Sequence, residues 1–129
     1  MQLKCIVVDD DPLFQVLMKS YVRKGYNNRL NLLGIAENGE KAKSLYEKYK
    51  DEIDVIFLDV KMPDMSGFDF LDEIDKRSDV AIIMVTGEEE RGGDAFEYGI
   101  VDYIVKPFTD ERFDQAIKRV EESRKSSEG

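Results

Sequence analysis

The sequence predicts an α/β fold, a (βα)5 doubly wound three-layer sandwich in which helices cover both faces of a five-stranded parallel sheet. Short apolar runs alternate along the chain with segments whose apolar residues recur at helical spacing. Such runs are typical of parallel strands that are buried on both faces. Right-handed crossovers between parallel strands place helices on both sides of the sheet. The length of 129 residues fits one domain with its own core.

Polar residues follow four of the five predicted strands, at the point where each strand ends. The strands are expected at 5–8, 30–36, 55–58, 81–85 and 103–105. All but the second end in a polar residue, and these residues are Asp9 with Asp10, Asp59, Thr86 and Lys106. Because the ligand crevice of an open parallel sheet lies outside the carboxyl ends of its strands, we expect these side chains to surround one small cavity.

Capping residues predict where the helices begin. The first helix is expected to begin at Pro12, with Asp11 as its N-cap, and to end near Gly25. The second, third and last helices are expected to follow capping side chains, which are Asn38, Ser66 and Thr109.

A short fourth helix is expected at about 92–98, and it should be the most mobile structured part of the domain. Gly92 and Gly93 near its start each cost about 1 kcal/mol relative to alanine in a helix, and Gly99 ends it. Its few apolar residues offer only a small face for packing. The domain itself is expected to span 1–124. Residues 125–129 contain no apolar residue and are expected to form a disordered tail or, at 128–129, to be left from cloning.

Composition limits the classes of function. The net charge of −9 argues against direct contact with nucleic acid, because phosphate binding needs clustered Lys and Arg. No apolar run approaches the length of a membrane span and no export signal is visible, so we expect a cytoplasmic protein without a membrane partner. The single cysteine, Cys5, lies inside the first apolar run and is expected to be a buried structural thiol.

The predicted cluster of polar residues suits a divalent metal and a phosphoryl group. Each of these residues, taken alone, could simply belong to a turn, a helix cap or a strand end. Their position at the same edge of the predicted sheet is what favours a functional site. Carboxylates about 4 Å apart repel by about 4 kcal/mol per pair at an effective dielectric constant of about 20, so the cluster implies a cation. Hard oxygen ligands favour Mg²⁺, and beside the metal a carboxylate can attack phosphorus. The chain has no histidine, which excludes histidine acid–base chemistry and His-ligated zinc.

Several motifs together resemble the receiver domain of two-component response regulators. They are Val7-Val8-Asp9-Asp10, Leu58-Asp59, Met62-Pro63 with Gly67, Val85-Thr86-Gly87, and Asp102-Tyr103 through Lys106-Pro107-Phe108. The match runs from about Leu3 to Arg124 in the order and spacing of the family. The resemblance implies a flavodoxin-like fold with strand order 2-1-3-4-5.

The resemblance also implies the chemistry of the site. Asp59 would be the phosphoacceptor, taking a phosphoryl group from the phosphohistidine of a sensor histidine kinase or a phosphotransfer protein. Asp10, Asp59 and the backbone carbonyl of Lys61 would ligate Mg²⁺, and Asp9 would act through a water molecule. Lys106 would pair with the phosphoryl group. The domain would be a signalling module rather than an enzyme, although it assists its own phosphorylation and dephosphorylation.

A conformational switch is part of the same resemblance. Thr86 would move to the phosphoryl group and Tyr103 would swing inward, which changes the face made by the fourth helix, fifth strand and fifth helix. That face would control an output domain or a target protein, or form a dimer. The bond between Lys106 and Pro107 would be cis. The family resemblance leaves open whether the chain acts alone or as the N-terminal receiver of a longer regulator.

Two positions that vary in such domains carry opposite charges here. Lys61 follows the phosphoacceptor by two residues and Glu88 follows the switch threonine by two. They could pair across the mouth of the site and hinder an attacking water, or both could be solvated, because exposed ion pairs contribute only about 0–1 kcal/mol.

Three other classes compete with this interpretation. A flavodoxin-like FMN carrier needs a phosphate-binding loop after the first strand, where Asp9 and Asp10 would repel phosphate. A phosphatase with an aspartyl nucleophile places a second Asp where Lys61 stands. A receiver that works without phosphorylation is disfavoured because all five expected residues are present.

Overall fold

The computed structural model describes residues 2–24, 29–87 and 98–128. Its centre is a parallel sheet of five strands in the order β2-β1-β3-β4-β5, which confirms the predicted fold and strand order. The strands are β1 (Leu3–Val8), β2 (Leu30–Ala36), β3 (Val55–Leu58), β4 (Ala81–Thr86) and β5 (Ile100–Val105).

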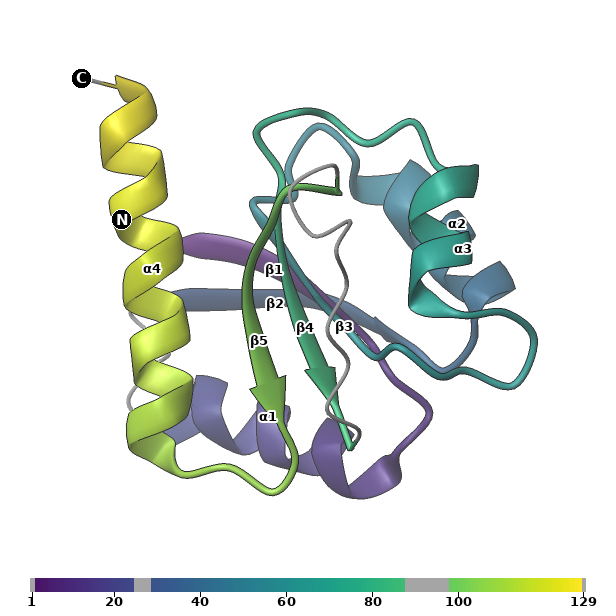
Figure 1. Ribbon diagram of the computed structural model, residues 1–129, viewed down its shortest axis with the longest axis horizontal. Helices are drawn as coiled ribbons and strands as arrows, with labels where there is room; N and C mark the ends of the chain where they lie inside the picture. Colours follow the sequence, from purple (N-terminus) through teal and green to yellow (C-terminus); the bar gives the residue numbers. More distant parts are fainter. Residues whose placement is uncertain (1, 25–28, 88–97, 129) are drawn as a thin grey trace.

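Helices cover both faces of this sheet, as Figure 1 shows. They are α1 (Pro12–Lys24), α2 (Gly39–Tyr49), α3 (Gly67–Glu73) and α4 (Asp110–Glu128). Helices α1 and α4 lie on one face, and α2 and α3 lie on the other. The helix expected at 92–98 lies outside the described residues except for Tyr98, as does Gly25. None of the described helices combines the length and apolarity needed to cross a bilayer.

The predicted caps hold the helix starts in place. The backbone N–H of Leu13 donates to Oδ1 of Asp11 at 3.0 Å, one residue inside α1. Asn38 and Thr109 accept equivalent bonds at the starts of α2 and α4, at 2.8 and 3.0 Å. Ser66 forms a capping box with Asp69, in which each side chain accepts from the other residue's backbone N–H. The polar side chains between the strands and the helices thus set where the helices begin.

The last helix is longer than expected. Helix α4 continues to Glu128, whereas the lack of apolar residues predicted a disordered tail over 125–129. Neither proline nor glycine occurs between Asp110 and Glu128, and Glu, Lys and Arg are good helix formers. Helix propensity of the backbone therefore accounts for the extension of α4 beyond residue 124.

Two apolar clusters fill the spaces between the layers. Between the sheet and the α1–α4 layer the helices contribute large buried side chains, among them Phe14, Met18, Tyr21, Phe113 and Ile117. Between the sheet and the α2–α3 layer they contribute Ala42, Tyr46, Phe70 and Leu71. Cys5 is fully buried in the first cluster, as predicted, and burial raises the pKa of its thiol to about 12. The thiol is therefore a packing group at neutral pH.

An ion cluster fastens β5 to α4. The carboxylate of Asp102, on β5, is almost fully buried. Both its oxygens accept from the guanidinium of Arg112, at 2.7 and 2.8 Å, and Oδ1 also accepts from Arg119 at 2.8 Å. The same Arg112 donates to the backbone oxygen of Tyr103 at 2.7 Å. A bidentate charge-assisted pair of this kind sets geometry as well as energy, so it fixes the strand end from which Lys106 emerges.

A glycine allows α3 to start directly against the end of β3. A Cβ at Gly67 would lie 2.5 Å from the backbone oxygen of Asp59 and 3.1 Å from Cγ of Leu58. The N–H of Gly67 donates to the oxygen of Val60 at 2.7 Å. The turn after β3 is therefore tight, because the first residue of α3 lies directly against the backbone of Asp59 and bonds to Val60.

We predict that Gly67→Ala destabilises the domain by about 1–3 kcal/mol, because the added methyl group would overlap a backbone oxygen that cannot move without shifting Asp59. Urea unfolding would measure the loss. Gly87→Ala is the matched control, since a Cβ at Gly87 meets no atom within 4 Å. Equal stabilities of the two variants would contradict the close approach.

Candidate functional site

Three carboxylates meet at the carboxyl edge of the sheet. Asp9 and Asp10 follow β1, and Asp59 follows β3, its direct neighbour, where Val8 pairs with Leu58. Parallel pairing in this register brings the residues after both strands together. One carboxylate oxygen from each of the three aspartates lies within 4.8 Å of the others. Asp9 is fully buried, Asp59 is 8% exposed and Asp10 is exposed.

The ammonium group of Lys106 lies within reach of this cluster. Its Nζ is 2.7 Å from Oδ2 of Asp9, 3.4 Å from Oδ2 of Asp11 and 3.8 Å from Oδ2 of Asp59. The peptide bond between Lys106 and Pro107 is cis, as the resemblance implied. The backbone N–H of Lys106 donates to the oxygen of Thr86 at 2.8 Å, which joins the ends of β5 and β4.

Backbone hydrogen bonds hold the carboxylates where they are. Oδ1 of Asp9 accepts from the N–H of Asp11 at 2.9 Å, and the backbone oxygen of Asp9 accepts from Nε2 of Gln15 at 2.7 Å. The N–H of Asp59 donates to the oxygen of Val8 at 2.9 Å, and its Oδ1 accepts a long bond of 3.4 Å from the N–H of Lys61. Asp9 is thus bonded through both carboxylate oxygens, whereas Asp59 is held less tightly.

Burial and charge shift the pKa values of the site in a consistent way. The pKa of Asp9 is raised to about 6, mainly by burial and to a smaller extent by the charge of Asp59, which together outweigh the hydrogen bonds from Lys106 and from the N–H of Asp11. Desolvation lowers the pKa of Lys106, but its hydrogen bond to Asp9 and the charges of Asp9, Asp59 and Asp11 outweigh this effect and raise it. The lysine therefore remains an ammonium ion at neutral pH.

The charges of the site do not balance. One ammonium group faces the three carboxylates of Asp9, Asp10 and Asp59, with Asp11 at the margin. Oxygen ligands in excess of nearby positive charge are a suitable environment for a hard divalent cation such as Mg²⁺. The partly exposed Asp59 carboxylate also leaves an oxygen from which a bond to phosphorus can form.

The other predicted site residues lie around this cluster at different depths. Thr86 is buried at the end of β4. Tyr103 is half-buried on β5 opposite Met84 and packs against the cluster on the α2–α3 side, so it lies beside the site rather than in it. Lys61 is exposed and forms an antiparallel bridge to Ser66. Glu88, its proposed ionic partner, lies outside the described residues.

Three residues near the site were not predicted from the sequence to belong there. Asp11 was expected only as a cap, and Gln15 and Phe14 only as helix residues. The structure brings Asp11 to 3.4 Å from Nζ of Lys106 and places the same Nζ 4.8 Å from the ring centre of Phe14. The run of three consecutive aspartates could have indicated that Asp11 lies at the site. Nothing in the sequence indicated this for Phe14, because it occupies an ordinary position on the apolar face of its helix.

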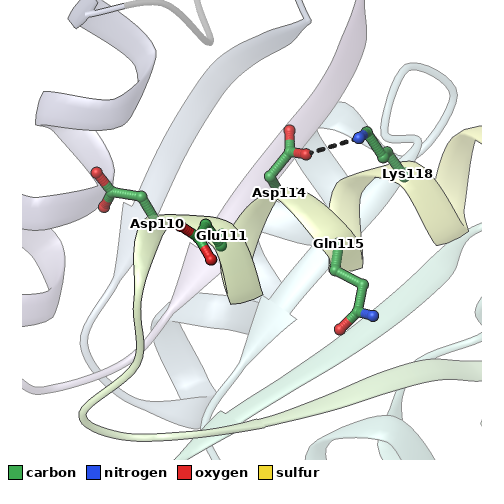
Figure 2. Close-up of a pocket in the computed structure, with 5 residues that line it drawn as sticks. All are labelled: Asp110, Glu111, Asp114, Gln115 and Lys118. Carbon is green, nitrogen blue, oxygen red and sulfur yellow. Dashed lines mark ion pairs between the residues drawn. The ribbon is translucent and has the colours of Figure 1, made fainter.

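A separate surface pocket lies along the first turns of α4, as Figure 2 shows. It is lined by Asp110, Glu111, Asp114, Gln115 and Lys118. All five side chains come from one helix, and Asp114 is already paired with Lys118 at 3.1 Å and with Arg29. Tyr21 of α1 donates to Asp110 at 2.7 Å. These contacts connect α4 to its neighbours, and the pocket lining shares no residue with the strand-end cluster.

The fold and the site define a flavodoxin-like α/β domain with an acidic site at the carboxyl edge of its sheet. The sequence model of the response regulator receiver domain matches residues 5–118. The chain therefore belongs to the receiver domain family of two-component response regulators, as its motifs indicated.

Known proteins of this family resemble the chain over most of its length. The sensory transduction protein LytR of Staphylococcus saprophyticus is 34% identical over 126 residues, which are 94% of this chain and 46% of LytR. A protein-glutamate methylesterase/protein-glutamine glutaminase of Burkholderia thailandensis is 36% identical over 112 residues, 84% of this chain and 30% of that protein. The chain thus spans between about a third and a half of the length of these curated relatives.

A solved structure supports the same assignment. A chain in the crystal structure of the CheX–CheY–BeF3–Mg complex from Borrelia burgdorferi is 26% identical, with a TM-score of 0.70. The match covers 92% of this chain and 88% of that chain.

We predict that, without a divalent cation, ionisation of Asp9 lowers the stability of the domain as the pH rises from about 4 to about 6. The pKa of Asp9 is about 6 in the folded protein against an ordinary value of 3.8. The folded state therefore binds more protons than the unfolded chain in this window, and the free energy of unfolding falls as the pH rises. Asp9→Asn should remove about 1–3 kcal/mol of this fall.

Urea unfolding in EDTA at several pH values would measure the effect. Asp10→Asn, which changes the exposed neighbour of Asp9, is the control. If Asp9→Asn and the wild type gave parallel curves of stability against pH, the carboxyl of Asp9 would not be the titrating group.

Proposed function

We propose that this domain accepts a phosphoryl group on Asp59, with Mg²⁺ bound beside it, in two-component signal transduction. The observation that carries the proposal is the position of the Asp59 carboxylate, which lies within 4.8 Å of the Asp9 and Asp10 carboxylates and 3.8 Å from the ammonium group of Lys106. As the bond between phosphorus and the histidine nitrogen of the donor breaks, an oxygen of Asp59 forms the new bond to phosphorus. Lys106 would then stabilise the charge on the phosphoryl oxygens.

For the metal, we propose that Asp10 and Asp59 are direct ligands, together with the backbone carbonyl of Lys61, and that Asp9 acts through water. Both carboxylate oxygens of Asp9 already accept hydrogen bonds, from Lys106 and from the N–H of Asp11, whereas Asp10 is exposed. The contact between the N–H of Lys61 and Asp59 keeps that residue beside the cluster. Bound Mg²⁺ would neutralise charge, and the related complex named above contains both BeF3 and magnesium.

For the switch, we propose that Thr86 bonds the phosphoryl group and that Tyr103 responds. Thr86 is buried next to the site and its backbone oxygen is bonded to Lys106. Tyr103 lies on the neighbouring strand. The surface that changes would consist of the segment 92–98, β5 and α4. A shift of this surface between two states would require a few kcal/mol, which the charge-assisted contacts of a phosphoryl group can supply.

We further propose that residues 1–124 form the receiver unit of a signalling protein rather than an enzyme. The unit would take its phosphoryl group from a sensor histidine kinase or phosphotransfer protein. It would act on an output domain or a target protein, or form a dimer through the switch surface. Sequence matches to part of longer relatives support such a modular role.

We predict that acetyl phosphate labels only Asp59, and only when Mg²⁺ is present. Asp59→Asn preserves the shape of the side chain but removes the nucleophilic oxygen, so it should abolish labelling while the domain stays folded. Intact-mass measurement would detect the added phosphate. A phosphorylated Asp59→Asn variant would rule out the proposed phosphoacceptor.

Magnesium affinity should fall further in Asp10→Asn than in Asp9→Asn. A direct ligand loses a metal bond, whereas a residue that acts through water loses only indirect support, an effect of about 10–100-fold in affinity. Titration of Mg²⁺ into the two matched variants gives the ranking. Equal losses, or a larger loss in Asp9→Asn, would reverse the proposed ligand assignment.

Beryllofluoride should change hydrogen exchange mainly in the segment 92–98 and in β5. The mimic would draw Thr86 toward Asp59 and shift the structure that follows β4. Asp59→Asn, treated in the same way, is the control for effects of the reagent. Changes centred on α1 or α2, with β5 unaffected, would place the switch elsewhere.

A further inference from the structure

The ammonium group of Lys106 has an aromatic ring as well as carboxylates around it. Nζ lies 4.8 Å above the centre of the Phe14 ring, within the range of a cation–π interaction. On its other sides it faces Asp9 at 2.7 Å and Asp59 at 3.8 Å. The Lys106 side chain is 18% exposed. Little water therefore competes with the ring for the ammonium charge.

The ring of Phe14 is held firmly by the core. It is 2% exposed and belongs to the cluster between the sheet and the α1–α4 layer. It meets Phe108 edge to face, with ring centres 6.0 Å apart. Phe108 in turn stacks on Phe113 at 6.1 Å, and Phe113 stacks on Tyr21 at 4.3 Å. These rings join α1, the loop after β5 and α4. Because the Phe14 ring is itself closely packed and meets Phe108 directly, its face toward Lys106 cannot turn away easily.

The distances around Lys106 indicate how the Phe14 ring can influence the position of the ammonium group. In this structure the ammonium group is closer to Asp9 than to Asp59, and pairing with a phosphoryl group on Asp59 requires it to move toward Asp59. A hydrogen bond to Asp9 opposes that movement because it is directional. The attraction of a ring face is broad and accepts no hydrogen bond in competition. The ring can therefore hold the ammonium group at the site while its carboxylate partner changes.

We propose that Phe14 is a positioning residue for phosphoryl transfer, which holds the ammonium group of Lys106 over its ring and so presents the charge to Asp59. This rests on the proposed function of Asp59. Phe14 does not touch the reacting atoms; it acts through Lys106. Its backbone position follows from Asp11 and Pro12, which start α1 directly after the acidic run and direct the third residue of the helix inward.

Two matched variants separate positioning from packing. Phe14→Leu and Phe113→Leu each replace a buried ring of the same cluster, and it is the Phe14 ring over which Nζ of Lys106 lies. With acetyl phosphate and saturating Mg²⁺, Phe14→Leu should phosphorylate about threefold to tenfold more slowly than wild type. Phe113→Leu should stay within about twofold, as a loss of packing alone would. Equal rates for the two variants would overturn the proposal.

A fluorinated ring gives the same test without a change in shape. Replacing Phe14 by 3,4,5-trifluorophenylalanine removes most of the negative potential of the ring face, so phosphorylation should slow as in Phe14→Leu while the melting temperature stays close to that of wild type. This arm remains decisive if Phe14→Leu does not fold. A trifluorinated protein that reacts at the wild-type rate would overturn the proposal.

The NMR signal of Lys106 reports the contact independently of phosphoryl transfer. Protons above a ring face are shifted upfield, so the ε-methylene protons of Lys106 should be upfield in the wild type and in Phe113→Leu, and lose this shift in Phe14→Leu. No upfield shift in the wild type would overturn the contact itself. A shifted Lys106 in a wild type that acetyl phosphate does not label would instead contradict the proposed function and leave the contact standing.

Discussion

The main constraint on this structure is the repulsion among the carboxylates at the end of the sheet. Parallel pairing of β1 with β3 brings these carboxylates together. The register that sets Val8 beside Leu58 places Asp9 and Asp59 at neighbouring strand ends, and neither can withdraw without breaking the sheet. Burial strengthens this repulsion, because a charge removed from water is poorly screened. The ion pair of Asp9 with Lys106 at 2.7 Å offsets part of it. A domain that keeps such a cluster needs positive charge from elsewhere, and its reactivity follows from that need.

Contacts elsewhere in the fold hold Lys106 beside Asp9 and Asp59. The buried pair of Asp102 with Arg112 joins β5 to α4, and the N–H of Lys106 is bonded to the oxygen of Thr86. The first contact joins β5 to the helix that follows it, and the second joins the ends of β4 and β5. The lysine is therefore positioned by β4, β5 and α4 together rather than by the loop that carries it. This explains why its surroundings include aromatic side chains from the core.

The sequence was sufficient for the features that depend on local order along the chain. Strand ends, capping residues and the run of aspartates at 9–11 can each be recognised from neighbouring residues in the sequence. The cluster of Asp9, Asp10 and Asp59 was therefore predicted correctly. The ring of Phe14 over Lys106 was not predicted, because it joins residues from α1 and the end of β5 and looks like any core position. The extent of α4 was misjudged for a different reason: burial was taken as necessary for helix, whereas backbone propensity alone extends it.

The bond from Arg112 to the backbone oxygen of Tyr103 has a consequence for solubility. β5 is the last strand in the sheet order, so one of its sides has no strand partner among the described residues and could pair with a strand of another molecule. The guanidinium of Arg112 covers a carbonyl of this strand, and the buried charge of Asp102 lies next to it. An added strand that displaced Arg112 would leave Asp102 short of its bidentate partner, at a cost of about 3–5 kcal/mol. The same ion pair that joins β5 to α4 thus disfavours the addition of a further strand at this edge.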